Sequence, residues 1–191
     1  MQVLVGVVTL VLVAAITPGP NNFVVLRAAA RAGLAAALPA IAGIVAGSLA
    51  LLAVVGAGAG ALFAAEPQLR TLVTVAGCAY LAWLGAGLLR SQPAAPAAST
   101  PPAGPLALFG FQFLNPKGWV MVLTATSAAP DAPWWLLAAV FAIVPALCLL
   151  VWSLLGAGIS RLLARPVAAA RFDRVMGVLL VTSAIALALG T

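Results

Sequence analysis

The chain has 191 residues, of which 65% are hydrophobic and 6% are charged, and its formal net charge is +6. Soluble domains carry about a quarter charged residues, so this composition excludes an ordinary soluble domain. An outer-membrane β-barrel is also excluded, because its strands are short and alternating, whereas the apolar stretches here are long and continuous. The basic residues lie between these stretches, as in membrane proteins, and argue against a nucleic-acid partner.

Six apolar stretches predict an all-α integral membrane protein with six transmembrane helices embedded in the lipid bilayer. They lie at about 3–26, 34–63, 69–89, 106–128, 134–159 and 175–189. Residues 91–105 are rich in proline and alanine, which predicts a semi-rigid cytoplasmic linker. This linker separates a first three-helix half, residues 1–90, from a second half, residues 106–191.

The distribution of arginine predicts the orientation. The loops after the first, third and fifth stretches contain Arg27, Arg31, Arg90, Arg161, Arg165, Arg171 and Arg174. The loops after the second and fourth contain only Arg70 as a basic residue, together with the acidic Glu66 and Asp131. Positive residues mark the cytoplasmic side, so both termini are expected outside, in the periplasm. Three spans per half then invert the second half relative to the first, as in many secondary transporters.

Polar, proline-containing segments interrupt the first and fourth stretches. Pro18, Gly19 and Pro20 break the first, and Pro116 breaks the fourth, because proline lacks a backbone donor and disfavours helix before it. Lipid cannot satisfy the freed backbone groups, so such breaks must line protein or a wet cavity. Matching interruptions in two halves predict two broken helices, 1 and 4, around a transporter binding site. A simple packing kink is the alternative for the first break.

Five polar side chains are candidate substrate-binding residues: Asn21, Asn22, Asn115, Lys117 and Tyr80. The asparagines offer donors and acceptors suited to a zwitterion. Lys117 lies deep in its stretch, where a charge costs about 2.5–3.5 kcal/mol and is functional by default. The alternative is that Lys117 snorkels to an interface. The hydroxyl of Tyr80 needs a partner, which either packing or a substrate could supply.

The remaining reactive residues suggest no catalysis. The chain has no histidine and three acidic residues, so neither a metal site nor a cofactor is expected. Asp173 is expected to pair with neighbouring arginines. Cys78 and Cys148 are interpreted as small buried hydrophobes. One alternative function is a membrane thiol–disulfide electron carrier, which would require cysteines beside the breaks; another is a non-transporting assembly subunit.

In this order, the motifs resemble the LysE/RhtB family of amino-acid exporters. The matching residues are Thr17-Pro18-Gly19-Pro20-Asn21, Arg31-Ala32-Gly33, Gly77-x-x-Tyr80-Leu81, Asn115-Pro116-Lys117 and Gly177. The segment 111–121 is more similar to the branch that contains cysteine and O-acetylserine exporters than to the lysine branch. The resemblance implies secondary active export of a small amino acid or related metabolite across the bacterial inner membrane, driven by the proton-motive force.

One position departs from the family pattern. Many members follow a glycine of the second span with an aspartate, whereas here Gly47 is followed by Ser48. The chain therefore offers no obvious acid at mid-membrane for proton coupling. Either Lys117 titrates or the coupling differs from that of such members. The sequence also leaves open whether the protein forms a homo-oligomer.

Overall fold

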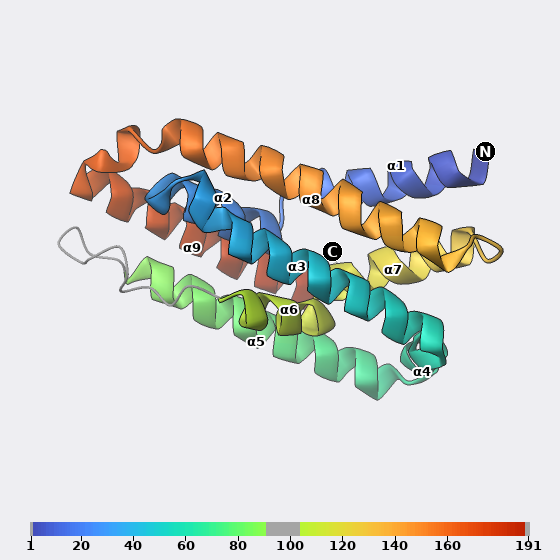
Figure 1. The fold of residues 1–191 in the computed structure, drawn as a ribbon. Helices are drawn as coiled ribbons and strands as arrows, with labels where there is room; N and C mark the ends of the chain where they lie inside the picture. The colour runs from blue at the N-terminus through green and yellow to red at the C-terminus, as the bar shows by residue number, and fades with distance from the viewer. Residues whose placement is uncertain (1, 91–103, 190–191) are drawn as a thin grey trace.

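The computed structural model describes residues 2–90 and 104–189, and within these ranges it contains helices and no strand (Figure 1). The all-α prediction is therefore confirmed. Most of the predicted linker, residues 91–103, lies outside the described residues. The helices are α1 (Gln2–Ile16), α2 (Pro20–Ala32), α3 (Leu34–Val54), the π-helical turn η1 (Val55–Ala59), α4 (Gly60–Ala65), α5 (Pro67–Leu89), α6 (Pro105–Leu114), α7 (Pro116–Ala128), α8 (Trp134–Ile159), the 3-10 turn η3 (Leu162–Ala164) and α9 (Pro166–Ala188).

Three described helical segments are long and apolar enough to cross a membrane: Leu34–Ala65, Pro67–Leu89 and Trp134–Gly158. A fourth crossing results if α1 and α2, which are bent by 57° at their junction, form one broken span. The helix α9 carries Arg171, Asp173 and Arg174 in its first half, which shortens its apolar part. Six spans in two inverted halves therefore remain a prediction.

Each proline-containing segment ends one helix and starts another. The helix α1 ends at Ile16 and α2 begins at Pro20, while α6 ends at Leu114 and α7 begins at Pro116. Proline is well tolerated at the first helical position, because the N–H it lacks would have no partner there. The intervening residues Gly19 and Asn115 have extended backbone. The chain thus restarts a helix directly after each break.

Backbone contacts at glycine hold the halves together. A Cβ at Gly85 of α5 would lie 2.8 Å from the carbonyl oxygen of Gly177 in α9, and one at Gly177 would lie 2.7 Å from that of Gly85. In the same way, Gly43 and Gly47 of α3 face the backbone of α6 at Pro105 and Phe109. Small residues let helix backbones approach closely, which drives packing where lipid removes the hydrophobic driving force.

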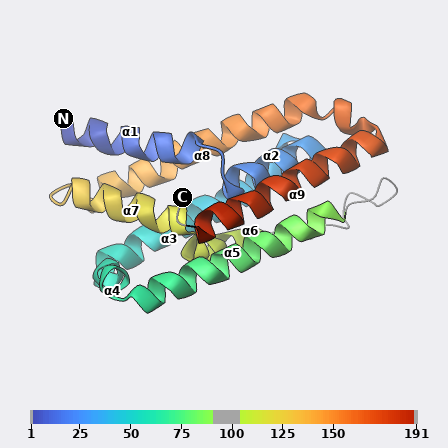
Figure 2. The same ribbon diagram turned by 180° about the vertical axis from the view of Figure 1, so that it is seen from behind.

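The connections of the bundle divide between its two ends. The N-terminus, α4 and the turn between α7 and α8 lie at one end in both views (Figures 1 and 2). The turn between α2 and α3, the C-terminal end of α5 and the turn between α8 and α9 lie at the other end. We call this second end the basic end. It brings together the segments from which the cytoplasmic side was predicted.

Candidate substrate-binding site

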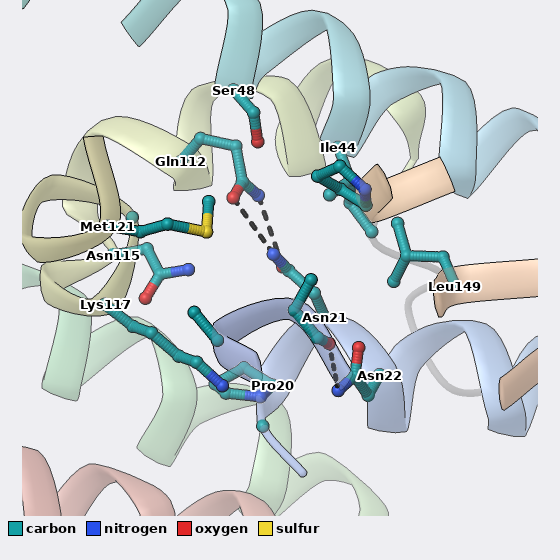
Figure 3. Close-up of a pocket in the computed structure, with 15 residues that line it drawn as sticks. Pro20, Asn21, Asn22, Ile44, Ser48, Gln112, Asn115, Lys117, Met121 and Leu149 are labelled. Carbon is teal, nitrogen blue, oxygen red and sulfur yellow. Dashed lines mark hydrogen bonds between the residues drawn. The ribbon is translucent and has the colours of Figure 1, made fainter. Parts of the chain in front are cut away.

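A cavity of about 50 Å³ lies where the two breaks meet (Figure 3). This volume exceeds the roughly 10–15 Å³ that a cavity needs to admit a water molecule. The polar side chains that line it are Asn21, Asn22, Ser48, Gln112, Asn115 and Lys117. They come from α2, α3, α6, the Asn115 junction and α7, so both predicted halves contribute to one site.

Lys117 joins the two breaks directly. Its Nζ donates a hydrogen bond of 3.0 Å to the carbonyl oxygen of Thr17, which lies just beyond the end of α1. A Cβ at Gly19 would lie 3.3 Å from this Nζ, so the glycine leaves room for the ammonium. The charge is held by a backbone carbonyl exposed by the break, as expected where broken helix is buried in protein.

Asn22 donates hydrogen bonds to two backbone carbonyl oxygens at the end of α1. Its Nδ2 donates to the carbonyl oxygens of Ala15 (3.1 Å) and Thr17 (2.8 Å), and the residue is buried. The Ala15 carbonyl belongs to the last turn of α1, where no intrahelical donor is available, and the Thr17 carbonyl lies just beyond that turn. Asn22 therefore stabilises the break itself, as well as lining the cavity.

Asn21 forms a reciprocal amide pair with Gln112 (Figure 3). Asn21 Nδ2 donates to Gln112 Oε1 at 3.0 Å, and Gln112 Nε2 donates to Asn21 Oδ1 at 3.2 Å and to Leu108 O at 2.9 Å. Gln112 is fully buried, and its amide is satisfied on both sides. The pair links α2 to α6 across the cavity wall. The sequence analysis missed Gln112, for which the signal was one amide in an otherwise apolar helix.

Asn115 presents an acceptor without a partner. The residue is 3% exposed and lines the cavity, and its Oδ1 has no hydrogen-bond partner among the described residues. Its side chain also makes no capping bond to α7. An unpaired buried acceptor costs about 1–3 kcal/mol, so it needs an explanation. A ligand with an N–H donor would supply one.

Other predicted residues lie apart from this cavity. Tyr80 packs on Phe111 with ring centroids 4.9 Å apart, and its buried hydroxyl has no partner among the described residues. Cys78 donates from its Sγ to Ala184 O at 3.2 Å, and neither it nor Cys148 lines the cavity. Pro18 and Pro116 are likewise absent from the lining, although Gly19 and Pro20 form part of it.

The expected local pairing of Asp173 is wrong. Its carboxylate is fully buried and contacts Arg27 of α2 at 2.8 Å, across 146 residues of sequence. Arg171 and Arg174 lie on exposed faces of α9, because residues two before and one after Asp173 point to other sides of a helix. The ion pair is therefore tertiary.

Comparisons with known proteins agree with the motifs. Residues 12–191 match the family described as LysE type translocator. A cysteine/O-acetylserine efflux protein of Klebsiella pneumoniae is 31% identical over 160 residues, which cover 81% of this chain and 82% of that protein. Proteins of the same name from Salmonella choleraesuis and Salmonella typhimurium are 34% identical over 119 residues, which cover 62% of this chain and 61% of theirs.

No solved structure matches the chain. The family match nevertheless spans both breaks and the whole second half. It excludes the electron-carrier alternative, for which the positions of Cys78 and Cys148 gave no support. The chain belongs to the LysE type translocator family and is a membrane transporter, not an enzyme.

Proposed function

We propose that this protein is a secondary active exporter of a small, neutral, zwitterionic amino acid or a close derivative, across the bacterial inner membrane. The observation that carries the proposal is that one small cavity contains both the Lys117 ammonium and Asn115 Oδ1, which has no partner among the described residues. The family and the relatives named cysteine/O-acetylserine efflux proteins support it.

The polar groups suit the two ends of a zwitterion. Lys117 would bind the substrate carboxylate, and the positive ends of α2 and α7, which both begin at the cavity, favour a negative charge there. Asn115 Oδ1 would accept a hydrogen bond from the substrate ammonium. No carboxylate is among the described lining residues, so a second cationic group on a lysine-like substrate would have no counter-charge.

The proposed mechanism is alternating access around this fixed site. Six spans in two inverted halves, with both termini in the periplasm, would place the broken helices at mid-membrane. Rocking of one half against the other would then open the cavity to each side in turn. Proton coupling is part of the proposal, although Ser48 stands in the cavity where many members have an acid.

Reconstituted vesicles test this function. We expect efflux of labelled cysteine and O-acetylserine from proteoliposomes to exceed efflux of lysine, to depend on a proton gradient, and to be lost in Lys117→Ala. Thr126→Val is a matched control, because Thr126 lies on α7 and bonds only carbonyls of its own helix. Equal movement of lysine, or no selective movement, would contradict the proposal; the latter would favour the assembly subunit.

A further inference from the structure

A cluster of charged residues lies between α2 and α9, outside the cavity. Arg27 Nε donates to Asp173 Oδ1 at 2.8 Å, and Arg27 Nη2 donates to Oδ2 at 3.3 Å. Arg31 Nη2 lies 3.8 Å from Oδ2. The Asp173 side chain is 0% exposed, whereas those of Arg27 and Arg31 are 16% and 17% exposed. We call these three residues the α2–α9 ion cluster.

Stability alone does not account for this cluster. Desolvation of a buried pair offsets most of its Coulombic gain, so well-packed apolar residues of similar volume often stabilise a fold as well or better. The best-attested use of such pairs is to select between alternative arrangements. The cluster is therefore a candidate for a contact that forms in one state of the transporter and opens in another.

The cluster connects the binding site to the opposite half. The helix α2 carries Asn21 and Asn22 in its first turn, and Arg27 follows Pro20 by seven residues, or about 10 Å along the helix. The same helix packs closely on α8, where Leu26 O faces Gly156, but its contact with α9 is much smaller. A movement of α2 with α8 away from α9 would open this ion cluster, together with the apolar packing around Phe23 and Met176.

Its place in the fold fixes which side it closes. Arg31 lies one residue before the end of α2, and Asp173 lies about two turns after the start of α9. Both of these helix ends belong to the basic end of the bundle (Figures 1 and 2). The cluster thus lies between the cavity and the basic end. Arg31 Nε has no hydrogen-bond partner among the described residues. A second guanidinium with an unused donor therefore lies beside the carboxylate of Asp173.

We propose that the α2–α9 ion cluster is a gate, in which Asp173 holds α2 against α9 and closes the cavity toward the basic end. The inference that this gate opens and closes during transport rests on the proposed export function. Closure itself can be measured without any substrate. Asp173 is thereby a positioning residue: it acts on the site through Arg27 and α2.

Thiol accessibility tests the gate. Cys78 and Cys148 are replaced by alanine and Ser48→Cys provides one cavity thiol, which is labelled with a membrane-impermeant maleimide in oriented vesicles. Asp173→Asn should increase labelling from the side of the basic end at least threefold, with no change from the other side. The exchange Arg27→Asp with Asp173→Arg should restore the original rate. Arg174→Gln, an exposed neighbour on α9, is the control and should have no effect.

Two results would overturn the gate: unchanged labelling in a monodisperse Asp173→Asn protein, or an equal increase from both sides, which indicates general loosening. If Asp173→Asn does not fold, a second variant replaces it. This variant carries Arg27→Cys and Asp173→Cys, and a short bifunctional thiol reagent joins the two cysteines. Joining should reduce labelling of the cavity thiol from the basic side, and cleavage of the linker should restore it; labelling indifferent to the linker would overturn the proposal. Altered labelling in these variants, combined with no amino-acid transport by the protein with Ser48 intact, would support the gate and reject the exporter.

Discussion

Replacement of Lys117 by methionine removes one charge at nearly constant length. In the substrate-free structure Nζ makes a charge-assisted hydrogen bond of 3.0 Å to Thr17 O, and we expect it to make an equivalent bond to a substrate carboxylate. Hydrogen bonds to charged groups contribute about 1.5–3 kcal/mol. At tenfold per 1.4 kcal/mol, Lys117→Met should weaken substrate binding by about 10- to 140-fold.

Equilibrium binding of a labelled neutral amino acid to the purified protein in nanodiscs measures this change. Lys117→Ala should in addition abolish efflux while the protein remains in the membrane. A thermal melt on the same samples separates binding from folding, since Lys117 also holds the Thr17 carbonyl. Native affinity in Lys117→Met, or a lower melting temperature with unchanged affinity of the folded fraction, would refute the assignment of Lys117 to the substrate.

Three further substitutions test the site and its frame. Asn115→Leu should weaken substrate binding about tenfold without lowering the melting temperature, because Oδ1 has no partner among the described residues; a strong loss of stability would contradict this. Gly77→Ala should abolish folded protein in membrane extracts, because the added Cβ would collide with Leu114 O, whereas Gly87→Ala on the same helix meets nothing within 4 Å and should be neutral. Gly58→Ala should lower the free energy of unfolding by about 1–3 kcal/mol, because Gly58 has a φ of 106° that strains any other residue, although an added Cβ would meet no atom within 4 Å. An unchanged melting temperature would indicate that the backbone of η1 adjusts to the substitution.

The broken helices could be predicted because their causes are local. Proline and glycine restrict or free the backbone at their own positions, so Pro20 and Pro116 marked where helices restart without any knowledge of the fold. The depth of Lys117 in an apolar stretch was likewise visible in the sequence. Its bond to Thr17 was not, because these residues are 100 positions apart.

The features that the sequence did not reveal depend on long-range pairing. Gln112 acquires its role only through Asn21, 91 residues away, and a lone amide in an apolar helix does not identify its partner. Asp173 was assigned to its nearest arginines, but helical periodicity turns those away and Arg27 takes their place. For Tyr80 the sequence left packing and substrate contact both open, and its ring packs on Phe111.

The bond between Lys117 and the Thr17 carbonyl bears on how the carrier returns after unloading. Moving an unpaired ammonium through a low-dielectric interior is unfavourable, because a buried charge is costly unless it is paired and hydrogen-bonded. In the proposed export cycle, the carbonyl oxygen of Thr17 would take the place of the departed substrate carboxylate. In that cycle, we expect this internal partner to lower the barrier to reorientation without cargo, and so to favour net extrusion over one-for-one exchange of solutes.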